Sequence, residues 1–320
     1  MRFDPTRFPA AAKATGFDAD NLEKVLRLRE LLTEIHKHPF LRDRVVLKGG
    51  TAINLFYLDL ARLSVDIDLN YIAQLGREEM LAERPDIVRA VDQIATGLGY
   101  RIQNGVDDHA LREWHLGYAN HTGAQDRIQV EINFLMRTCA LPPRVLPAVS
   151  ASDPLSCEFL VLAIEELFAG KLKAMIDRRH PRDLYDLFRF AKSKLPYDSE
   201  ILRKLAVLFS STMDRDFRTY KIDRVSEVDA KQVDILLYPL LKADDRPTLA
   251  GMLVATKPLL ESALDHNREA AYLAAIAEGK YRPELLFPQQ TDIAARIREH
   301  PALIWKAENV ARYLIKSKKT

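Results

Sequence analysis

Cysteine is scarce in this sequence, and long apolar runs are missing from it. The two cysteines, Cys139 and Cys157, do not have the spacing of metal ligands, so we expect a reducing compartment and no disulfide framework. No stretch approaches the roughly 18–20 apolar residues that a membrane span requires. Residues 1–16 contain charge and proline but no apolar segment typical of a signal peptide. We therefore expect a soluble, cytoplasmic protein without a membrane partner.

The sequence also lacks a charge excess of either sign. Its 47 Lys and Arg residues against 45 Asp and Glu residues give a formal net charge of +2. A contact with nucleic acid therefore has to come from a local basic patch. No Walker-type phosphate loop and no kinase glycine-rich loop is present, which excludes those two classes of nucleotide-binding protein. With 320 residues, 48% of them hydrophobic, the chain is long enough for one large domain or two ordinary ones.

The most informative segment runs from residue 45 to residue 71. An apolar run, residues 45–47, is followed by Gly49 and Gly50 and then by apolar residues at helical spacing as far as Tyr57. A second run, residues 65–71, alternates strictly between apolar and polar side chains, as in a half-buried strand. The segment predicts a strand, a glycine-hinged turn, a short helix and a second strand.

Three acidic side chains are candidates for a metal site on strands of this kind. Asp66 and Asp68 point to the same side of the second strand, roughly 6–7 Å apart, and repel each other unless a cation lies between them. A later predicted strand, residues 127–134, carries Glu131 on its polar face. An acidic pair on a strand is often only a solvated edge, and a glycine pair before a helix is often only a turn. The order and spacing of these features together are much more specific.

The patterns predict an α+β fold, with an N-terminal mixed β-sheet flanked by helices and a mainly α-helical C-terminal domain. A proline-rich stretch at residues 142–154 marks the boundary, so we expect a core domain at 1–150 and a helical domain at 151–320. In the core, Asp20 and Glu23 predict the capped start of a helix. Further strands are expected at 100–103 and 114–119. Helices are expected at 158–177, from Pro181 onward, and near 199–210, 230–241, 248–264, 269–278, 291–299 and 303–316.

The first two helices of the helical domain carry charged residues. Lys171 and Lys173 lie on the first, and Asp183 lies in the first turn of the second. An acidic residue is favourable there simply because the N-terminus of a helix is positive. The densest basic cluster in the chain lies between these helices and comprises Arg178, Arg179, His180 and Arg182.

Together these residues favour nucleotidyl transfer from an NTP to a hydroxyl group. If Asp66, Asp68 and Glu131 converge, their oxygen atoms suit Mg²⁺, or Mn²⁺ in its place, bound jointly with substrate phosphates. Two such ions would stabilise both the attacking and the leaving oxygen of a displacement at phosphorus. The glycine turn lets a triphosphate approach the backbone. Either Lys171 or Arg182 can neutralise the departing pyrophosphate.

Several motifs occur in a definite order along residues 40–190. They are Gly49-Gly50-Thr51, Arg62-x-Ser64-x-Asp66-Ile67-Asp68-Leu69, Val130-Glu131-Ile132-Asn133, Glu166…Lys171-Leu172 and Arg182-Asp183-Leu184-Tyr185-Asp186-Leu187. This set resembles the nucleotidyltransferase superfamily built around DNA polymerase β-like folds, and more narrowly the AbiEii abortive-infection toxins and their mycobacterial MenT relatives. The resemblance implies a nucleotidyltransferase-like core domain, a helical domain that closes the active-site cleft, and the toxin of a type IV toxin–antitoxin pair that acts in phage defence.

The resemblance also implies roles for individual residues. The metal-binding role of the family motif falls on Asp66 and Asp68, with Glu131 as the strand acid. Lys171 contacts phosphates, although Lys173 is the alternative, and Asp183 orients or deprotonates the attacking hydroxyl. Ser64 matches a position that a partner kinase phosphorylates in some relatives. The predicted nucleotide-binding residues are Lys48, Gly49, Gly50, Thr51, Arg62, Ser64 and Lys171, and the candidate RNA contacts are Arg178, Arg179 and Arg182.

Some relatives add nucleotides to the 3′ end of tRNA, which blocks aminoacylation and hence translation. The resemblance therefore implies an NTP substrate, a tRNA or other RNA acceptor, and a cognate antitoxin protein. Two alternatives stay open: transfer of the nucleotide to a protein or a small molecule, and a nucleotide-binding interaction module without turnover. The complete acidic set argues against the module, because a pure binder does not need it. The basic cluster favours a polyanionic acceptor.

Overall fold

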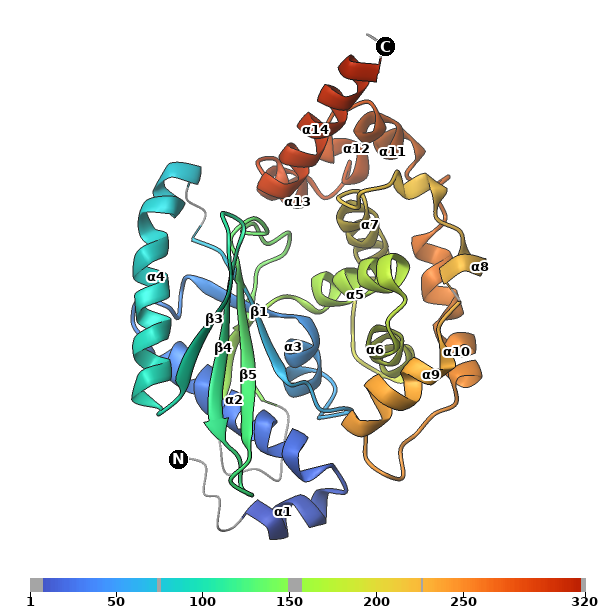
Figure 1. The fold of residues 1–320 in the computed structure, drawn as a ribbon. Coiled ribbons are helices and arrows are strands. Elements are labelled where there is room, and N and C mark those ends of the chain that lie inside the picture. Colours follow the sequence, from blue (N-terminus) through green and yellow to red (C-terminus); the bar gives the residue numbers. More distant parts are fainter. Residues whose placement is uncertain (1–7, 74–75, 149–156, 226, 318–320) are drawn as a thin grey trace. The chain divides into compact units, whose positions relative to one another are not determined.

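A computed structural model describes residues 8–73, 76–148, 157–225 and 227–317 of the chain (Figure 1). The chain forms two compact units. The first comprises Met1–Arg137, Pro143–Leu162 and Asp234–Pro247, and the second comprises Thr138–Pro142, Ala163–Val233 and Thr248–Thr320. The expected boundary at 150/151 lies in 149–156, outside the described residues. The segment Asp234–Pro247 belongs to the first unit although it follows part of the second unit in the sequence. The two are joined by hydrogen bonds, for example from Leu63 N to Leu240 O at 2.8 Å.

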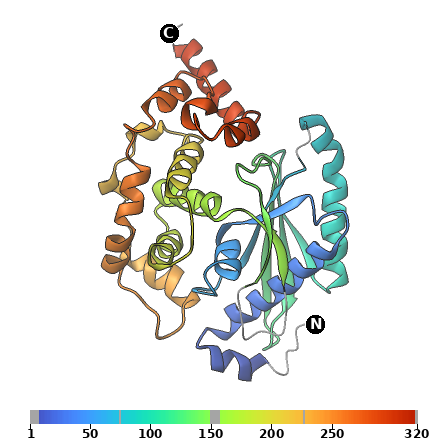
Figure 2. The same ribbon diagram turned by 180° about the vertical axis from the view of Figure 1, so that it is seen from behind.

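The first unit is built on one mixed sheet, as expected. Within the described residues, seven strands follow the order β3–β4–β5–β2–β1–β7–β6. β2 is antiparallel to β1 and parallel to β5, which is antiparallel to β4. α2 crosses one face of the sheet (Figure 2). The elements are α1 (Phe8–Thr15), α2 (Ala19–Lys37), β1 (Val45–Lys48), α3 (Gly49–Phe56), β2 (Asp66–Tyr71), α4 (Arg77–Gly97), β3 (Arg101–Asp107), β4 (Leu111–Ala119), β5 (Gln125–Asn133), β6 (Arg144–Pro147) and β7 (Glu158–Val161).

The strand–turn–helix–strand prediction for residues 45–71 is confirmed by β1, α3 and β2. In β2 the side chains of Ile67, Leu69 and Tyr71 are fully buried, whereas Asp66 and Asp68 are partly exposed. Because side chains alternate across a strand, one face of β2 belongs to the core and the other carries the acidic pair. The hydrophobic core therefore fixes which way the carboxylates point.

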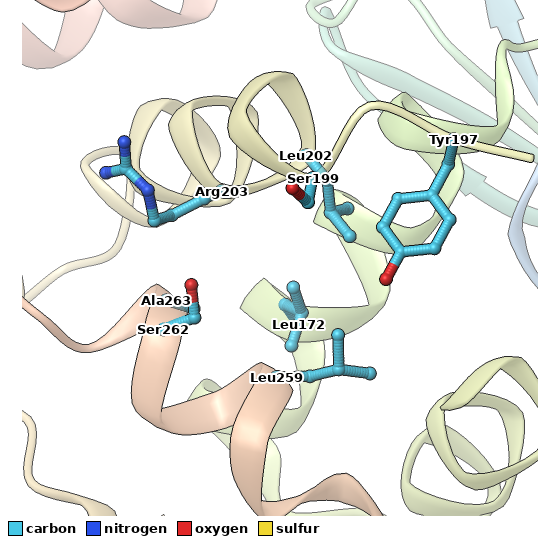
Figure 3. A pocket seen from close by; sticks show the side chains of 8 residues that line it. All are labelled: Leu172, Tyr197, Ser199, Leu202, Arg203, Leu259, Ser262 and Ala263. Carbon is cyan, nitrogen blue, oxygen red and sulfur yellow. The ribbon is translucent and has the colours of Figure 1, made fainter. Parts of the chain in front are cut away.

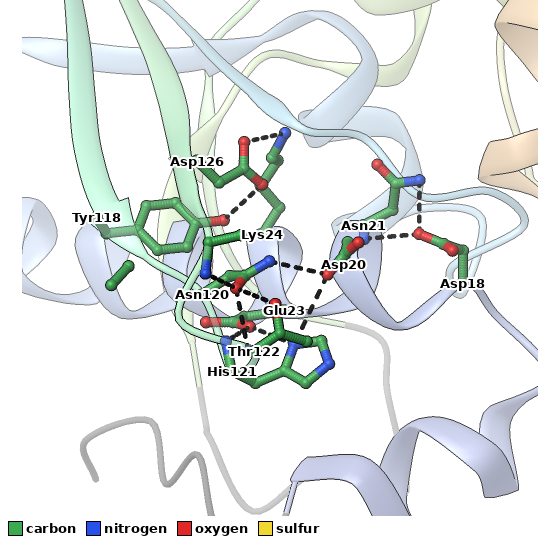
Figure 4. Close-up of polar contacts among 12 residues, drawn as sticks. Asp18, Asp20, Asn21, Glu23, Lys24, Tyr118, Asn120, His121, Thr122 and Asp126 are labelled. Atoms are coloured by element: carbon green, nitrogen blue, oxygen red, sulfur yellow. Dashed lines mark hydrogen bonds and ion pairs between the residues drawn. The ribbon is translucent and has the colours of Figure 1, made fainter.

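The start of α2 differs from the prediction, and its acidic residues hold a neighbouring hairpin. Asp18, not Asp20, is the N-cap, and it accepts a hydrogen bond from Asn21 N at 3.0 Å. Glu23 is fully buried and accepts a hydrogen bond from His121 N, in the β4–β5 turn, at 2.7 Å (Figure 4). A buried carboxylate needs such partners, so Glu23 is used in tertiary structure rather than in a capping box. This contact holds the turn that leads into β5.

The second unit is helical, but its first helix is shorter than predicted. Residues 158–161 form β7 instead, because Phe159 and Val161 are buried and the strand pairs with β1 and β6. The region expected as one helix at 230–241 is a sequence of short helical pieces. The elements from here to the C-terminus are α5 (Ile164–Arg178), α6 (Pro181–Lys192), α7 (Ser199–Ser210), η1 (Phe217–Thr219), α8 (Ile222–Val225), α9 (Ala230–Gln232), η2 (Val233–Leu237), η3 (Tyr238–Leu240), α10 (Leu249–Ala263), α11 (Ala270–Ala277), α12 (Pro283–Leu286), α13 (Thr291–Ile297) and α14 (Pro301–Ser317). Of these, η3 and the part of η2 after Val233 belong to the first unit.

The core of this unit is close-packed. The rings of Phe168 and Phe190 stack at a centroid distance of 3.8 Å. A hollow of about 40 Å³ between α5, α7 and α10 is lined by side chains that include Leu172, Leu202 and Leu259 (Figure 3). Nucleotide-sized ligands occupy pockets of about 300–1,000 Å³, so this hollow is too small for one. Within the described residues, no helix has both the length and the apolar content that a membrane crossing requires.

Candidate active site

In the first unit, four strands place charged residues in a single row. Lys48 on β1 lies opposite Asp68 on β2, Asp68 lies opposite Glu131 on β5, and Glu131 lies opposite Glu113 on β4. We call these four residues the charged row. The Nζ atom of Lys48 lies 3.5 Å from Oε1 of Glu131. Asp66 lies two residues from the row, opposite Gln129. The sheet register thus brings together three of the predicted site residues.

The glycine pair is shaped by what lies next to it. Gly49 has a φ of +73°, a left-handed conformation that favours glycine, and a Cβ there would collide with the carboxylate of Asp68. A Cβ on Gly50 would lie 2.5 Å from Nη2 of Arg62 and 2.7 Å from Oγ of Ser64. The two glycines therefore let Asp68, Arg62 and Ser64 gather around the first turn of α3.

Hydrogen bonds fix this turn on the sheet. Thr51 donates from Oγ1 to the carbonyl oxygen of Asp66 at 2.5 Å. Arg62 is buried, and its Nη1 donates to the carbonyl oxygen of Leu63 at 2.9 Å. Lys48 is the N-cap of α3, but its side chain makes no capping hydrogen bond. All the predicted nucleotide-binding residues of this unit thus lie at the junction of β1, α3 and β2.

Burial raises the pKa of the Glu131 carboxyl above its usual range. Lys48 acts in the opposite direction, whereas the carboxylates of Asp68 and Glu113 add to the rise. Like charges placed directly opposite each other on a sheet are unfavourable, and a bound cation would relieve them. The contacts of Glu131 with Asp68 and Glu113 are therefore unfavourable in the free protein, and Lys48 offsets part of this repulsion.

The oxygen atoms at this site suit a divalent cation, but they do not form a complete cage. Within the described parts of the chain, no three His, Cys, Asp or Glu side chains gather closely enough to hold a metal ion. Asp66 is offset along β2, and Glu131 is paired with Lys48. Mg²⁺ usually binds through one or two carboxylates and completes its shell with water and substrate phosphates. The residues fit Mg²⁺ on that basis, with Asp66, Asp68 and Glu131 as the candidate ligands.

In the second unit, Lys171 and Asp183 bind each other. Nζ of Lys171 lies 2.8 Å from Oδ1 of Asp183 and 3.0 Å from Oδ2 of Asp186. Both carboxylates are fully buried, and Lys171 is nearly so. Arg178 donates to Oδ2 of Asp183 from Nε at 2.7 Å. Lys173 faces elsewhere on α5 and pairs with Asp177 at 3.2 Å.

This network sets the charge state of Asp183. Burial alone would raise the pKa of Asp183, but Lys171 and Arg178 outweigh burial and hold it well below its usual range. A carboxylate that is so hard to protonate is a weak base. The geometry therefore favours the orienting role of Asp183 over the deprotonating role.

The basic cluster is less uniform than its sequence indicates. Burial, with nearby Arg182 adding to it, lowers the pKa of His180 to about 4, so this ring is neutral at neutral pH. Its Nδ1 accepts a hydrogen bond from Arg182 N at 3.2 Å as the N-cap of α6. Arg179 pairs with Glu227 at 3.5 Å, and Arg178 extends from the Asp183 network with more than half of its side chain exposed. The three arginines thus carry the positive charge without His180.

Comparison with known proteins places these motifs in a family. The family model described as "Nucleotidyl transferase AbiEii toxin, Type IV TA system" matches residues 30–275, which is most of the chain. The chain belongs to the AbiEii nucleotidyltransferase toxin family. No curated protein sequence matches it.

Two solved structures resemble this AbiEii protein in fold. One is MenT4, the nucleotidyltransferase toxin Rv2826c from Mycobacterium tuberculosis H37Rv, with a TM-score of 0.60 at 20% identity over 93% of this chain and 99% of that one. The other is JHP933 from Helicobacter pylori, with a TM-score of 0.51 at 18% identity over 81% of this chain and 99% of that one. The family membership indicates that the protein is a nucleotidyltransferase enzyme and a toxin–antitoxin component.

The structure adds two acidic residues that the sequence analysis of this AbiEii protein did not select. Glu113 extends the charged row, and Asp186 is the second carboxylate bound to Lys171. The signal for Asp186 was present, because Asp183 and Asp186 are three residues apart and so lie on one helix face. Glu113 could have been found from the alternation of buried residues along β4. Neither signal assigns a role to the residue before its partner is known.

Glu166, in another family motif, gives a prediction about stability. Its carboxylate is buried on α5 and accepts hydrogen bonds from Ala140 N and Leu141 N, both at 3.0 Å. Burial nevertheless raises its pKa from 4.5 to about 7. The folded state then keeps a proton that the unfolded state loses, so stability falls as the pH rises from about 4.5 to about 7 and is constant above it.

We expect this effect to reach about 3 kcal/mol at most, at 1.36 kcal/mol for each pKa unit. Denaturant unfolding of the wild type and of Glu166→Gln across that pH range measures it. Glutamine can accept only one of the two backbone hydrogen bonds, so the variant is less stable at pH 5, but its stability should change less with pH. An equal pH dependence in both proteins would contradict the assignment.

Proposed function

We propose that this AbiEii family enzyme transfers a nucleoside monophosphate from an NTP to the 3′ end of an RNA, with tRNA as the favoured acceptor. The reaction depends on Mg²⁺ and inhibits translation, and a cognate antitoxin protein counters it. The observation that carries the proposal is the convergence of Lys48, Asp68 and Glu131 beside the Gly49–Gly50 turn. Acidic oxygens beside backbone that a phosphate can approach suit chemistry at phosphorus.

The transfer is a displacement at the α-phosphorus of the NTP. The hydroxyl oxygen of the acceptor forms a bond to that phosphorus, and the bond from the phosphorus to the bridging oxygen breaks. The electron pair of the broken bond leaves with pyrophosphate. Carboxylates from among Asp66, Asp68 and Glu131 would hold Mg²⁺, which would supply charge neutralisation at the phosphate oxygens. The hydroxyl proton passes to solvent water, since Asp183 is a weak base and Glu131 is a candidate metal ligand.

Residues of the second unit have supporting roles in this proposal. Lys171 contributes positive charge to the phosphates, and Asp183, held by Lys171 and Arg178, orients the acceptor. Arg178, Arg179 and Arg182 contact the RNA backbone, which is recognised through its charge. Arg62 and Ser64 lie against Gly50, so a change at Ser64, such as phosphorylation, would act directly on the turn that receives the nucleotide.

The test is to incubate the full-length protein with Mg²⁺, total RNA and each α-labelled NTP in turn. We expect label in RNA of tRNA size with the preferred NTP, and none when the γ-phosphate carries the label, because that phosphate leaves in pyrophosphate. RNA whose terminal diol has been oxidised with periodate is the matched control, since it lacks a reactive 3′ end. It should accept no label.

The other outcomes separate the alternatives. Label on protein alone would show that the acceptor is a protein and not RNA. Label on oxidised RNA would contradict addition at the 3′ end. Nucleotide binding without transfer to any acceptor would contradict the catalytic proposal.

A further inference from the structure

The last helix presents large side chains to solvent. In α14, the exposed fraction is 55% for Trp305, 71% for Tyr313 and 58% for Ile315. The other side of α14 is anchored in the second unit, because Leu303 and Ala307 are buried. The turn at Gly279 packs so closely that a Cβ on this glycine would lie 2.7 Å from the backbone nitrogen of Ala311. The exposed residues are therefore not needed for the packing of this helix within its unit.

The exposed side of α14 combines an aromatic ring with basic groups. Trp305, Asn309, Arg312 and Lys316 are spaced i, i+4, i+7 and i+11, which places them along one stripe of the helix. We call these four residues the α14 stripe. Residues 301–317 contain three basic residues and one acidic residue, a net charge of +2 in a chain whose total is also +2. The stripe thus combines an exposed tryptophan with two cations, one of which, Arg312, pairs with Glu308.

We propose that the α14 stripe docks single-stranded RNA, with the indole of Trp305 stacking on a base and Arg312 and Lys316 contacting phosphates. This inference rests on the proposed function in so far as the RNA is the acceptor. Stacking on an aromatic ring does not depend on base sequence, and basic side chains follow the phosphate backbone. Tyr313, next to Arg312 and even more exposed, offers a second ring.

The pattern fits RNA better than it fits a protein partner. A helix that docks on a protein presents apolar residues at i, i+3 or i+4, and i+7. Here the positions that follow Trp305 on its own stripe are Asn309, Arg312 and Lys316. Tyr313 and Ile315 are two positions apart in the sequence, and a helix turns by about 200° over two positions. The two side chains therefore lie on opposite sides of that stripe. The exposed apolar groups therefore do not form one continuous surface for a partner helix.

The two tryptophans of the chain make the proposal measurable. Trp114 is fully buried and donates its indole N–H to Asp92, whereas Trp305 is exposed. We expect a short single-stranded RNA, added without NTP, to quench the emission of Trp305 and to protect it from acrylamide. In Trp305→Phe this change should disappear, while the emission of Trp114 remains as an internal control.

Affinity provides the second readout. Trp305→Ala should weaken RNA binding by about 10-fold. Arg312→Ala should weaken it and reduce the slope of affinity against salt concentration by about one. The matched controls are on α10 of the same unit: Val254→Ala removes an exposed apolar side chain, and Lys257→Ala removes a cation from an exposed i,i+4 ion pair like that of Arg312 with Glu308. Both controls should bind RNA like the wild type.

The proposal fails if RNA binds without a change in Trp305 emission, or if the α10 controls lose as much affinity as the α14 variants. It also fails if a partner protein, and not RNA, produces the protection of Trp305. Because the assay contains no NTP, a protein that transfers no nucleotide can still pass it. Conversely, transfer to RNA without any effect at Trp305 would overturn this inference and leave the proposed function intact.

Discussion

Asparagine in place of Asp66 or Asp68 is expected to lower the rate of nucleotide transfer by about 10²–10³-fold or more, while the fold is kept. Each substitution preserves the shape of the side chain but removes a charge that would hold the cation at the phosphates. The buried face of β2 consists of Ile67, Leu69 and Tyr71 and is not touched by either change. Transfer of α-label to RNA and thermal unfolding, measured on the same preparations, give the two quantities.

The stability of the same two variants without metal checks that the fold is kept. Asp68 lies between Glu131 and Lys48 on the neighbouring strands, whereas Asp66 lies opposite Gln129. Asp68→Asn relieves the repulsion by Glu131 but also removes the attraction to Lys48, so we expect its stability to stay within about 1 kcal/mol of the wild type. Addition of Mg²⁺ should raise the unfolding temperature of the wild type, because a ligand that binds only the folded state stabilises it. This gain should be absent from both variants.

Asp43→Asn is the matched control, because it removes a carboxylate of the first unit that is 73% exposed and lies outside the charged row. It should transfer nucleotides and respond to Mg²⁺ like the wild type. If Asp66→Asn and Asp68→Asn both retain transfer, the metal-binding role assigned to β2 is wrong.

The part of the candidate site within residues 45–71 could be predicted because it depends on patterns between residues that are close in the sequence. Strict alternation over residues 65–71 was enough to place Asp66 and Asp68 together on the face away from the core, since a strand has only two faces. The glycine pair predicted a turn, and the φ angle of Gly49 is positive, as such a turn allows. What the alternation did not contain was the register between strands, which sets Lys48, Asp68, Glu131 and Glu113 in one row.

The misses arise from long-range partners. Residues 158–161 read as the start of a helix, but pairing with β1 and β6 makes them β7. Tertiary pairing outweighs helix propensity in so short a segment. Likewise, Lys171 and Asp183 were both selected as site residues, but the ion pairs of Lys171 with Asp183 and Asp186, 12 and 15 residues further along the chain, were not predicted. Because these carboxylates are buried, a substitution at Lys171 changes the stability of the protein as well as any contact with phosphate.

Removal of the Lys171 charge is expected to cost stability as well as activity. In Lys171→Met, Arg178 still compensates Asp183, but Asp186 loses the ion pair that it makes with Lys171 inside the unit. Breaking a buried pair by removing one partner costs about 3–5 kcal/mol. Lys173 is exposed and its pair with Asp177 is a surface pair, so Lys173→Met should change stability by no more than about 1 kcal/mol. Denaturant unfolding of the two variants measures this difference.

A double variant separates the two roles of Lys171. Lys171→Met with Asp186→Asn removes one charge of each sign and leaves Asp183 paired with Arg178, so most of the lost stability should return. If Lys171 also contacts the substrate phosphates, the transfer rate and the KM for NTP should stay impaired in this stable protein. Recovery of transfer together with stability would make Lys171 a purely structural residue. A larger loss of NTP use in Lys173→Met than in the double variant would instead assign the phosphate contact to Lys173.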